Sequence, residues 1–277
     1  MSDAASELPT NAPVLIRQTF DTWLEYSEQT EILVHVTHEG FMRVQRIPEI
    51  LKILHGALED SDVESIAHAE RTSALSKKES EAGFPTLHAH SLLGLWGALE
   101  CFVEDLFVAM LEVDPSHLSG AAFSKVKLPV ALLGASEHDR CRAILNEATR
   151  ATDADLAVGV SKFERLLRMV GLSGEVPDAI KSAVFQSQQI RNVWAHRGGV
   201  ADERFVGRCP SLGYNVGEKV NMGAARFLPL MHGLHMYGIV IFNRYQATRG
   251  RDPLLVECVG YEGVLTRPSE GAAERRS

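Results

Sequence analysis

The 277-residue chain has no long apolar run and no paired cysteines. No stretch approaches the roughly 20 apolar residues that a membrane-spanning helix needs. The N-terminal segment MSDAASELPT has neither the basic nor the apolar region of a secretory signal. The four cysteines are far apart and form no CxxC pair, which favours reduced thiols over a disulfide scaffold. We therefore expect a cytoplasmic protein that does not act in a membrane.

The formal net charge is −8, which by itself argues against a nucleic-acid partner. The charge is unevenly distributed, because residues 1–180 hold fifteen Lys/Arg and twenty-eight Asp/Glu, whereas residues 181–251 hold ten and three. A basic segment on an acidic chain can still offer a local surface for phosphates. Composition alone, however, favours an ordinary solvated surface on which the basic residues cluster by chance.

Apolar residues recur every three to four positions along most of the chain, which predicts amphipathic helices. The predicted helices are 14–36 (ended by Gly40), 47–58, an exposed helix within 59–83, 85–112, 137–150, 156–170, 177–196 and 222–248, the last kinked by Pro229 or beginning there. Residues 200–221 are predicted as an ordered loop, and 254–259 as a short strand or extended arm. Because strands and helices do not alternate, we expect an all-α fold.

One short segment combines residue types suited to RNA cleavage. Arg191, Asn192 and His196 lie near the predicted C-terminal end of a helix, before two glycines. A guanidinium binds phosphate bidentately and keeps its charge, and an imidazole can move the proton of a ribose 2′-hydroxyl near neutral pH. Asn192 and His196 are four residues apart, so the amide could orient the ring.

The spacing of Arg191 and His196 sets a geometric condition. Five residues place the two side chains about 140° apart around an ideal helix. Both reach one phosphate only if the helix unwinds near His196, as Gly198 and Gly199 would permit, or if a second subunit supplies part of the site.

Arg191-Asn192 with His196 resembles the R-x4–6-H motif of the HEPN superfamily. The stretch SLLGLWGALECFVEDLF, residues 91–107 with Glu100 at mid-helix, resembles the earlier core helix of the RiboL-PSP-HEPN group. The resemblance implies an all-α HEPN-like bundle over residues 85–250, an N-terminal helical extension over 1–84, and a C-terminal arm and tail over 251–277.

The resemblance also implies an activity. HEPN proteins of this kind are usually homodimers whose motifs meet in a shared cleft, and they cleave RNA without a metal or another cofactor. By that likeness Arg191 and His196 are catalytic and Asn192 is the orienting residue. Many such proteins are toxins or anti-phage effectors, so RNA, a second copy of the chain and an antitoxin protein are the candidate partners.

Four further residues are candidates for substrate binding. Arg197, Arg204 and Arg208 follow the motif and could contact phosphates, or they are solvated loop charges. Glu100 could hold Arg191 or the dimer cleft as a supporting carboxylate; alternatively it is a surface residue or pairs with an arginine of the bundle. The motif itself could be a polar cluster that only complements the helix dipole.

Two other functions stay open. A non-catalytic HEPN-like scaffold that binds a partner protein or a nucleotide is favoured somewhat by the acidic body of the chain. A metal-dependent hydrolase would use the H-x-x-H pairs His35/His38 and His232/His235, whose spacing suits zinc. No third ligand accompanies either pair, so we assign no metal site.

Overall fold

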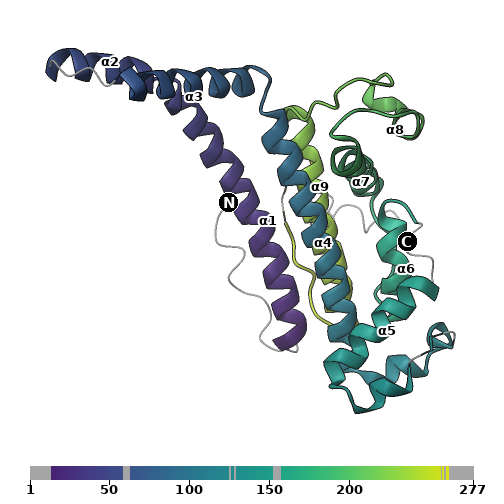
Figure 1. Cartoon of the computed structure of the whole chain (residues 1–277). Helices are drawn as coiled ribbons and strands as arrows, with labels where there is room; N and C mark the ends of the chain where they lie inside the picture. The colour runs from purple at the N-terminus through teal and green to yellow at the C-terminus, as the bar shows by residue number, and fades with distance from the viewer. Residues whose placement is uncertain are drawn as a thin grey trace, which may run out of the picture. The chain divides into compact units, whose positions relative to one another are not determined.

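The structure is a computed structural model that describes residues 14–58, 63–124, 126–127, 129–151, 157–256, 258 and 260–261. These residues form helices and connecting turns, and an isolated antiparallel bridge joins Val200 to Lys219. The predicted all-α fold class is confirmed (Figure 1). The finer assignment to a HEPN-like bundle stays a prediction.

The elements follow the hydrophobic periodicity closely. The α-helices are α1 (Val14–Val44), α2 (Ile47–Leu58), α3 (Val63–Glu81), α4 (Pro85–Val113), α5 (Glu137–Ala151), α6 (Val160–Met169), α7 (Asp178–Arg197), α8 (Glu203–Arg208) and α9 (Ala224–Thr248). The short 3-10 helices are η1 (Pro115–Ser119), η2 (Ala121–Phe123), η3 (Val130–Gly134) and η5 (Pro210–Leu212).

The chain divides into two compact units, which are described separately below. The first unit comprises the described residues of 1–26, 95–189 and 229–277, and the second comprises those of 27–94 and 190–228. The borders fall inside α1, α4, α7 and α9. The predicted division at residues 84 and 250 stays a prediction.

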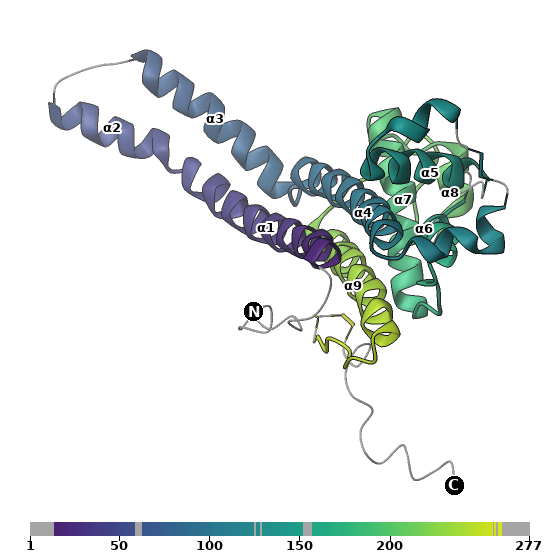
Figure 2. The same cartoon turned by 90° about the horizontal axis from the view of Figure 1, so that it is seen from below.

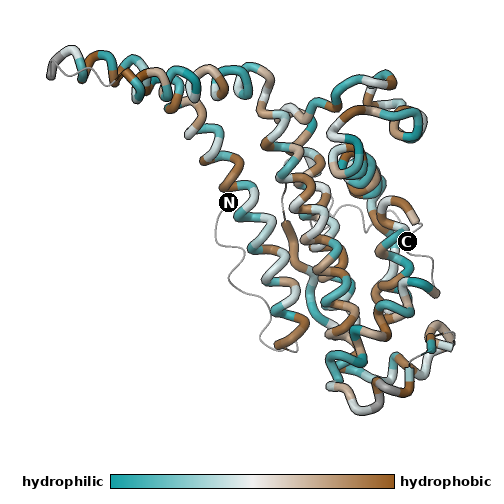
Figure 3. The backbone as a smooth tube through the Cα atoms, viewed as in Figure 1, coloured by the Kyte–Doolittle hydropathy of each residue, from teal (hydrophilic) through white to brown (hydrophobic). Residues whose placement is uncertain are grey.

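The core of the first unit is aromatic where α1, α4 and α9 meet. The rings of Phe20 and Phe242 stack with centroids 3.9 Å apart, and Phe102 meets Phe20 edge-on at 6.1 Å. All three side chains are buried. Such pairs add about 1 kcal/mol each beyond the burial of their area. Figure 3 shows hydrophobic residues recurring along α4 and α9.

Two glycines of α9 allow neighbouring segments to approach closely. A Cβ built on Gly238 would lie 2.0 Å from Nε1 of Trp23 in α1, and one on Gly233 would lie 2.3 Å from Cβ of Ala183. Neither position leaves room for a side chain. The mid-helix glycines of α9 are therefore explained by packing, which outweighs their cost of about 1 kcal/mol in a helix.

A polar network also lies within the first unit. The Glu164 carboxylate accepts hydrogen bonds from Arg244 Nη1 and from the Tyr237 hydroxyl, both at 2.8 Å. Arg244 also donates to the carbonyl oxygens of Leu172 and Glu175. The network ties α6 and the segment before α7 to α9, with its two charges paired, as buried charges require.

In the second unit, α2 and α3 lie side by side (Figure 2). Lys52 of α2 pairs with Glu70 of α3 at 2.6 Å, and Ser76 donates to the Phe41 carbonyl at 2.6 Å. The α2 helix leaves Ile53 and Ile50 exposed, at 69% and 52%. This pair of helices therefore presents apolar side chains outward as well as inward.

A pair of histidines joins distant parts of the second unit. Nδ1 of the buried His88 lies 2.5 Å from the Met222 carbonyl oxygen, and its Nε2 lies 3.0 Å from Nε2 of His38. Since the carbonyl can only accept, His88 donates through Nδ1 and accepts from His38 through Nε2. Burial lowers the pKa of both rings, and His88 stacks on Phe227 at 4.7 Å.

Three local predictions are wrong or incomplete. Gly40 does not end the first helix, because α1 continues to Val44. Pro229 is not the start of α9, which begins five residues earlier at Ala224. The predicted loop 200–221 contains α8, whose first turn is capped by the Asp202 carboxylate accepting from the Phe205 N–H at 2.8 Å. In the predicted arm 254–259, the Asn243 side-chain amide holds the Leu254 backbone. Residues 257 and 259 of that arm, and the predicted tail from 262 onward, lie outside the described residues.

Candidate functional site

The α7 helix carries the predicted motif and stays helical to its end. Asp178 lies in its first turn, where a carboxylate suits the helix dipole. Gly198 and Gly199 follow its last residue with φ of +58° and +80°, a left-handed conformation that glycine adopts without strain. Because α7 includes Arg197, the helix does not unwind at His196.

Arg191 and Asn192 contact each other within α7. Nη1 of Arg191 donates to Oδ1 of Asn192 at 3.2 Å, and both side chains are half-buried. The side chains of Asn192 and His196, both within the described part of the chain, form no hydrogen bond with each other. The expected amide–imidazole contact is thus absent here, and the amide oxygen is positioned to fix the guanidinium instead.

His196 is exposed in the last turn of α7. Its ring makes no hydrogen bond or ion pair with any residue in the described part of the chain. Both ring nitrogens are therefore available to a substrate or to solvent, which a general acid or base requires.

The end of α7 is closed by a returning segment that the sequence did not single out. Trp194 donates from Nε1 to the Val220 carbonyl at 3.2 Å, and Nζ of Lys219 donates to the Gly198 carbonyl at 2.5 Å. The same ammonium lies 4.7 Å from the centre of the Trp194 ring. A Cβ on Gly199 would lie 2.9 Å from that ring, so Trp194 serves packing, as expected for a Trp inside a bundle.

The three arginines after the motif lie in the same unit as Arg191 and His196. Arg204 and Arg208 are exposed on α8, four residues apart and hence on one face. Arg197 is also exposed, with Nε 3.6 Å from a carboxylate oxygen of Asp202. All three side chains are therefore at the surface, and Arg197 is paired with an acidic residue.

Glu100 belongs to the first unit and has a different partner. Its Oε1 lies 2.5 Å from Nζ of Lys162 on α6, and both side chains are 21% exposed. The carboxylate is thus paired with a lysine of its own unit. Nothing in these contacts supports a role in holding Arg191.

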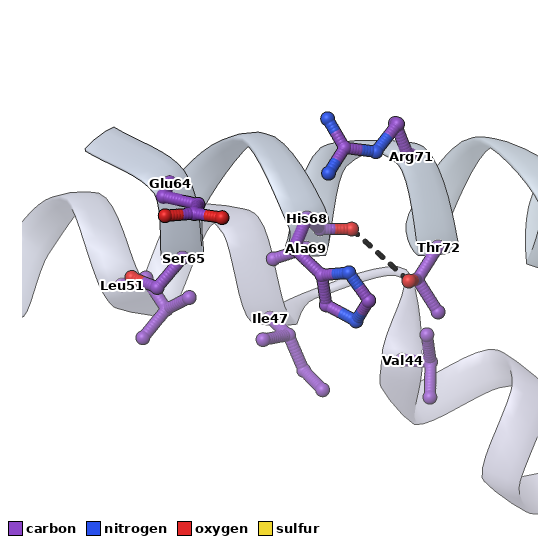
Figure 4. Close-up of a pocket in the computed structure, with 9 residues that line it drawn as sticks. All are labelled: Val44, Ile47, Leu51, Glu64, Ser65, His68, Ala69, Arg71 and Thr72. Atoms are coloured by element: carbon purple, nitrogen blue, oxygen red, sulfur yellow. Dashed lines mark hydrogen bonds between the residues drawn. The ribbon is translucent and has the colours of Figure 1, made fainter. Parts of the chain in front are cut away.

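Two cavities lie within the second unit. One, of about 590 Å³, is formed by the α1–α2 junction and α3, with Val44, Ile47 and Leu51 as its apolar wall (Figure 4). Figure 4 shows the His68 ring pointing from α3 toward Ile47 and Val44. The other, of about 720 Å³, is polar and includes Lys219.

The histidine pairs do not assemble a metal site in the described residues, which hold no group of three or more His, Cys, Asp or Glu side chains able to bind a metal ion. His38 contacts His88, fifty residues away, through its Nε2. On α9, burial and the neighbouring His232 lower the pKa of His235 to about 4. His38 and His235 are both partly buried.

Comparison with known proteins gives no further assignment. No family model, curated protein or solved structure matches the chain. Among the helices that the structure describes, none is both long and apolar enough to cross a membrane. The functional conclusion therefore depends on the geometry of α7 and its surroundings.

Proposed function

We propose that this chain is a metal-independent endoribonuclease of the HEPN type. The observation that carries the proposal is the exposed ring of His196, which has no hydrogen-bond or ion-pair partner among the described residues, on the same helix as the Arg191–Asn192 pair. The exposed Arg204 and Arg208 supply positive charge nearby in the chain. As part of the proposal, the protein acts as a toxin or anti-phage effector, with an antitoxin as its protein partner.

The chemistry assigns one task to each motif residue. His196 removes the proton of the ribose 2′-hydroxyl, whose oxygen then attacks the adjacent phosphorus. The bond from phosphorus to the 5′-oxygen breaks, and that oxygen takes up a proton from an imidazolium. The products are a 2′,3′-cyclic phosphate and a 5′-hydroxyl. Arg191 stabilises the charge on the phosphoryl oxygens, and Asn192 holds the guanidinium in place.

A homodimer is part of the proposal, because one copy alone does not satisfy the geometry. On the continuous α7 helix, Arg191 and His196 are about 7.5 Å apart along the axis and about 140° apart around it. Two copies related by a twofold axis would bring His196 of one copy to Arg191 of the other. Each dimer would then contain two composite sites.

Cleavage of RNA in the presence of EDTA tests the activity. The wild type is expected to leave 2′,3′-cyclic phosphate ends, and His196→Ala is expected to lose at least about 100-fold in rate. His90→Ala is the matched control, since His90 is an exposed histidine on α4. Equal cleavage by wild type and His196→Ala, or a requirement for a divalent metal, would contradict the proposal.

Mixing two inactive variants tests the composite site. Copies with Arg191→Ala and copies with His196→Ala should complement each other, because a mixed dimer retains one intact Arg–His pair. Random mixing makes half of the dimers mixed, so about a quarter of the wild-type activity should return. No recovery, from variants shown to exchange subunits, means that both residues act within one copy.

A non-catalytic scaffold is the second candidate, and the exposed apolar residues of α2 favour it. Ile50, Ile53 and Leu54 are 52%, 69% and 49% exposed and follow a three-to-four spacing, typical of helices that dock on a partner. The two candidates predict opposite results: Ile53→Asp should leave RNA cleavage unchanged if the chain is a nuclease. A scaffold would show no cleavage in any variant and would lose its protein partner on that substitution.

A further inference from the structure

The polar cavity of about 720 Å³ lies beside the end of the motif helix. Its lining includes Tyr214, Lys219, Asn221 and Arg226. Lys219 joins it to α7, because its Nζ donates to the carbonyl of Gly198, two residues after His196. Through Lys219, the cavity is therefore linked to the residue that directly follows α7, within the second unit.

Arg226 is held rigidly at this cavity. Its Nη2 donates to the Leu212 carbonyl at 3.3 Å, and its Nη1 donates to the Tyr214 hydroxyl. The guanidinium also lies 4.7 Å from the centre of the Tyr214 ring. The Tyr214 hydroxyl in turn donates to the Asn221 carbonyl at 2.8 Å. A guanidinium has five N–H donors. The bonds to Leu212 and Tyr214 therefore leave other N–H donors of Arg226 for a ligand, and they fix the orientation of the guanidinium.

The charge of the cavity favours an anion. Lys219 and Arg226 contribute two positive charges, and Glu218 contributes one negative charge. The Glu218 carboxylate accepts the Asn215 N–H at 2.6 Å, and this hydrogen bond lowers the pKa of Glu218. All three charged side chains line the cavity, and two of the three are cations, so the balance of charge is positive.

We propose that this cavity is a binding subsite for a phosphate of single-stranded RNA next to the cleaved bond. Lys219 and Arg226 bind the phosphate, and the open pocket has a volume within the range of small-ligand pockets, about 300–1,000 Å³. The inference rests on the proposed ribonuclease function. It adds two substrate-binding residues beyond the arginines that follow the motif.

The test measures binding without cleavage. A 2′-O-methyl RNA oligonucleotide lacks the attacking hydroxyl, so its affinity can be measured by fluorescence anisotropy in the active protein. Lys219→Gln removes the charge and keeps a donor for the Gly198 carbonyl. Losing one phosphate contact should weaken binding about fivefold at 0.1 M salt and reduce the salt slope by about 0.7.

Two further variants separate charge from folding. Lys219→Arg keeps the positive charge and should keep both the affinity and the salt slope. Lys181→Gln, near the opposite end of α7 and paired with Asp178, should bind as the wild type does. Arg226→Gln should weaken binding at least as much as Lys219→Gln, with its helical signal and melting temperature checked alongside.

The outcomes separate this inference from the proposed function. Cleavage by the wild type, together with unchanged oligonucleotide binding by Lys219→Gln, overturns the subsite and leaves the nuclease intact. Binding that depends on Lys219 but without any cleavage supports the subsite and refutes the nuclease. A nucleoside 3′-phosphate that binds as tightly as the oligonucleotide points to a free nucleotide and overturns the RNA assignment. No oligonucleotide binding at all refutes both.

Discussion

Gly238 offers a sharp test of the packing in the first unit. A Cβ at this position would lie 2.0 Å from Nε1, 2.7 Å from Cδ1 and 2.8 Å from Cε2 of Trp23. Atoms in favourable contact are about 3.5–4.0 Å apart, so in Gly238→Ala the indole must move by about 1.5 Å. Trp23 is only 1% exposed, which leaves it no open space to move into.

The magnitude follows from two opposing terms. Replacing a mid-helix glycine by alanine gains about 1 kcal/mol in helix propensity. Overpacking a closed core costs about 1–3 kcal/mol, and the contact with a fused ring places Gly238→Ala at the upper end. We expect a net loss of about 2 kcal/mol. Gly97→Ala in α4 is the control, because no described atom beyond its chain neighbours and the adjacent backbone of its own helix lies within 4 Å of its Cβ position. It should gain about 1 kcal/mol.

Urea unfolding and thermal melts measure both variants. For a chain of this size, each kcal/mol shifts the melting temperature by about 2–4 °C. Gly238→Ala should therefore melt about 4–8 °C below the wild type and Gly97→Ala about 2–4 °C above it. If Gly238→Ala is as stable as Gly97→Ala, then α9 does not approach Trp23 as described, and the packing argument for the α9 glycines is wrong.

Three further predictions concern stability. Burial lowers the pKa of His88 below the value of about 6.5 in the unfolded chain. The unfolded state therefore binds the extra proton, and stability falls as pH drops below about 6.5. The urea midpoint of His88→Gln should fall less between pH 7.5 and 5.5 than that of the wild type, and equal falls would refute this. Gly199→Ala combines a φ of +80° with a contact at 2.9 Å to Trp194, and should lower the unfolding free energy by about 2 kcal/mol; a loss under about 1 kcal/mol means that the ring yields. Glu164→Ala leaves the Arg244 guanidinium, whose side chain is 16% exposed, without its partner charge, and should cost about 3 kcal/mol by urea titration; a near-neutral result means that water replaces the carboxylate.

Most of the longer helices were predictable from the sequence because they carry apolar residues at helical spacing. The α4 helix was predicted over 85–112 and extends over Pro85–Val113. The exposed helix predicted within 59–83 corresponds to α3. Glycine was a poorer guide: Gly40 lies inside α1, since a single glycine costs only about 1 kcal/mol and the packing around Phe41 and Ser76 continues past it.

Contacts between distant residues could not be predicted in this way. The spacing of His35 and His38 suggested a local pair, yet His38 contacts His88 from another helix. The hydrogen bond from Lys219 to the Gly198 carbonyl, just after α7, depends on the path that the chain takes through residues 200–220. In contrast, α8 had a readable signal in Asp202, which caps it three residues before Phe205.

The candidate site was predictable only in part. The sequence placed Arg191, Asn192 and His196 at the end of a helix, where the structure also has them. It did not reveal that the Asn192 amide would accept from Arg191, because the choice between two neighbours of one amide depends on side-chain rotamers. Nor did it reveal the partner of Glu100, which comes from a helix far along the chain.

The backbone at the end of α7 has a consequence for how this protein could diversify. The backbone N–H of Val220 donates to the Gly199 carbonyl, and that of Gly217 donates to the Ala201 carbonyl, each at 2.8 Å. These two bonds hold the ends of the intervening segment together. The segment between them, residues 202–216, contains α8 and the buried Phe205. Because its ends are already held together, its length can change at exposed positions at small entropic cost. Insertions or deletions at those positions would change the surface of the second unit while α7 stays in place, so this surface can vary without rebuilding the fold.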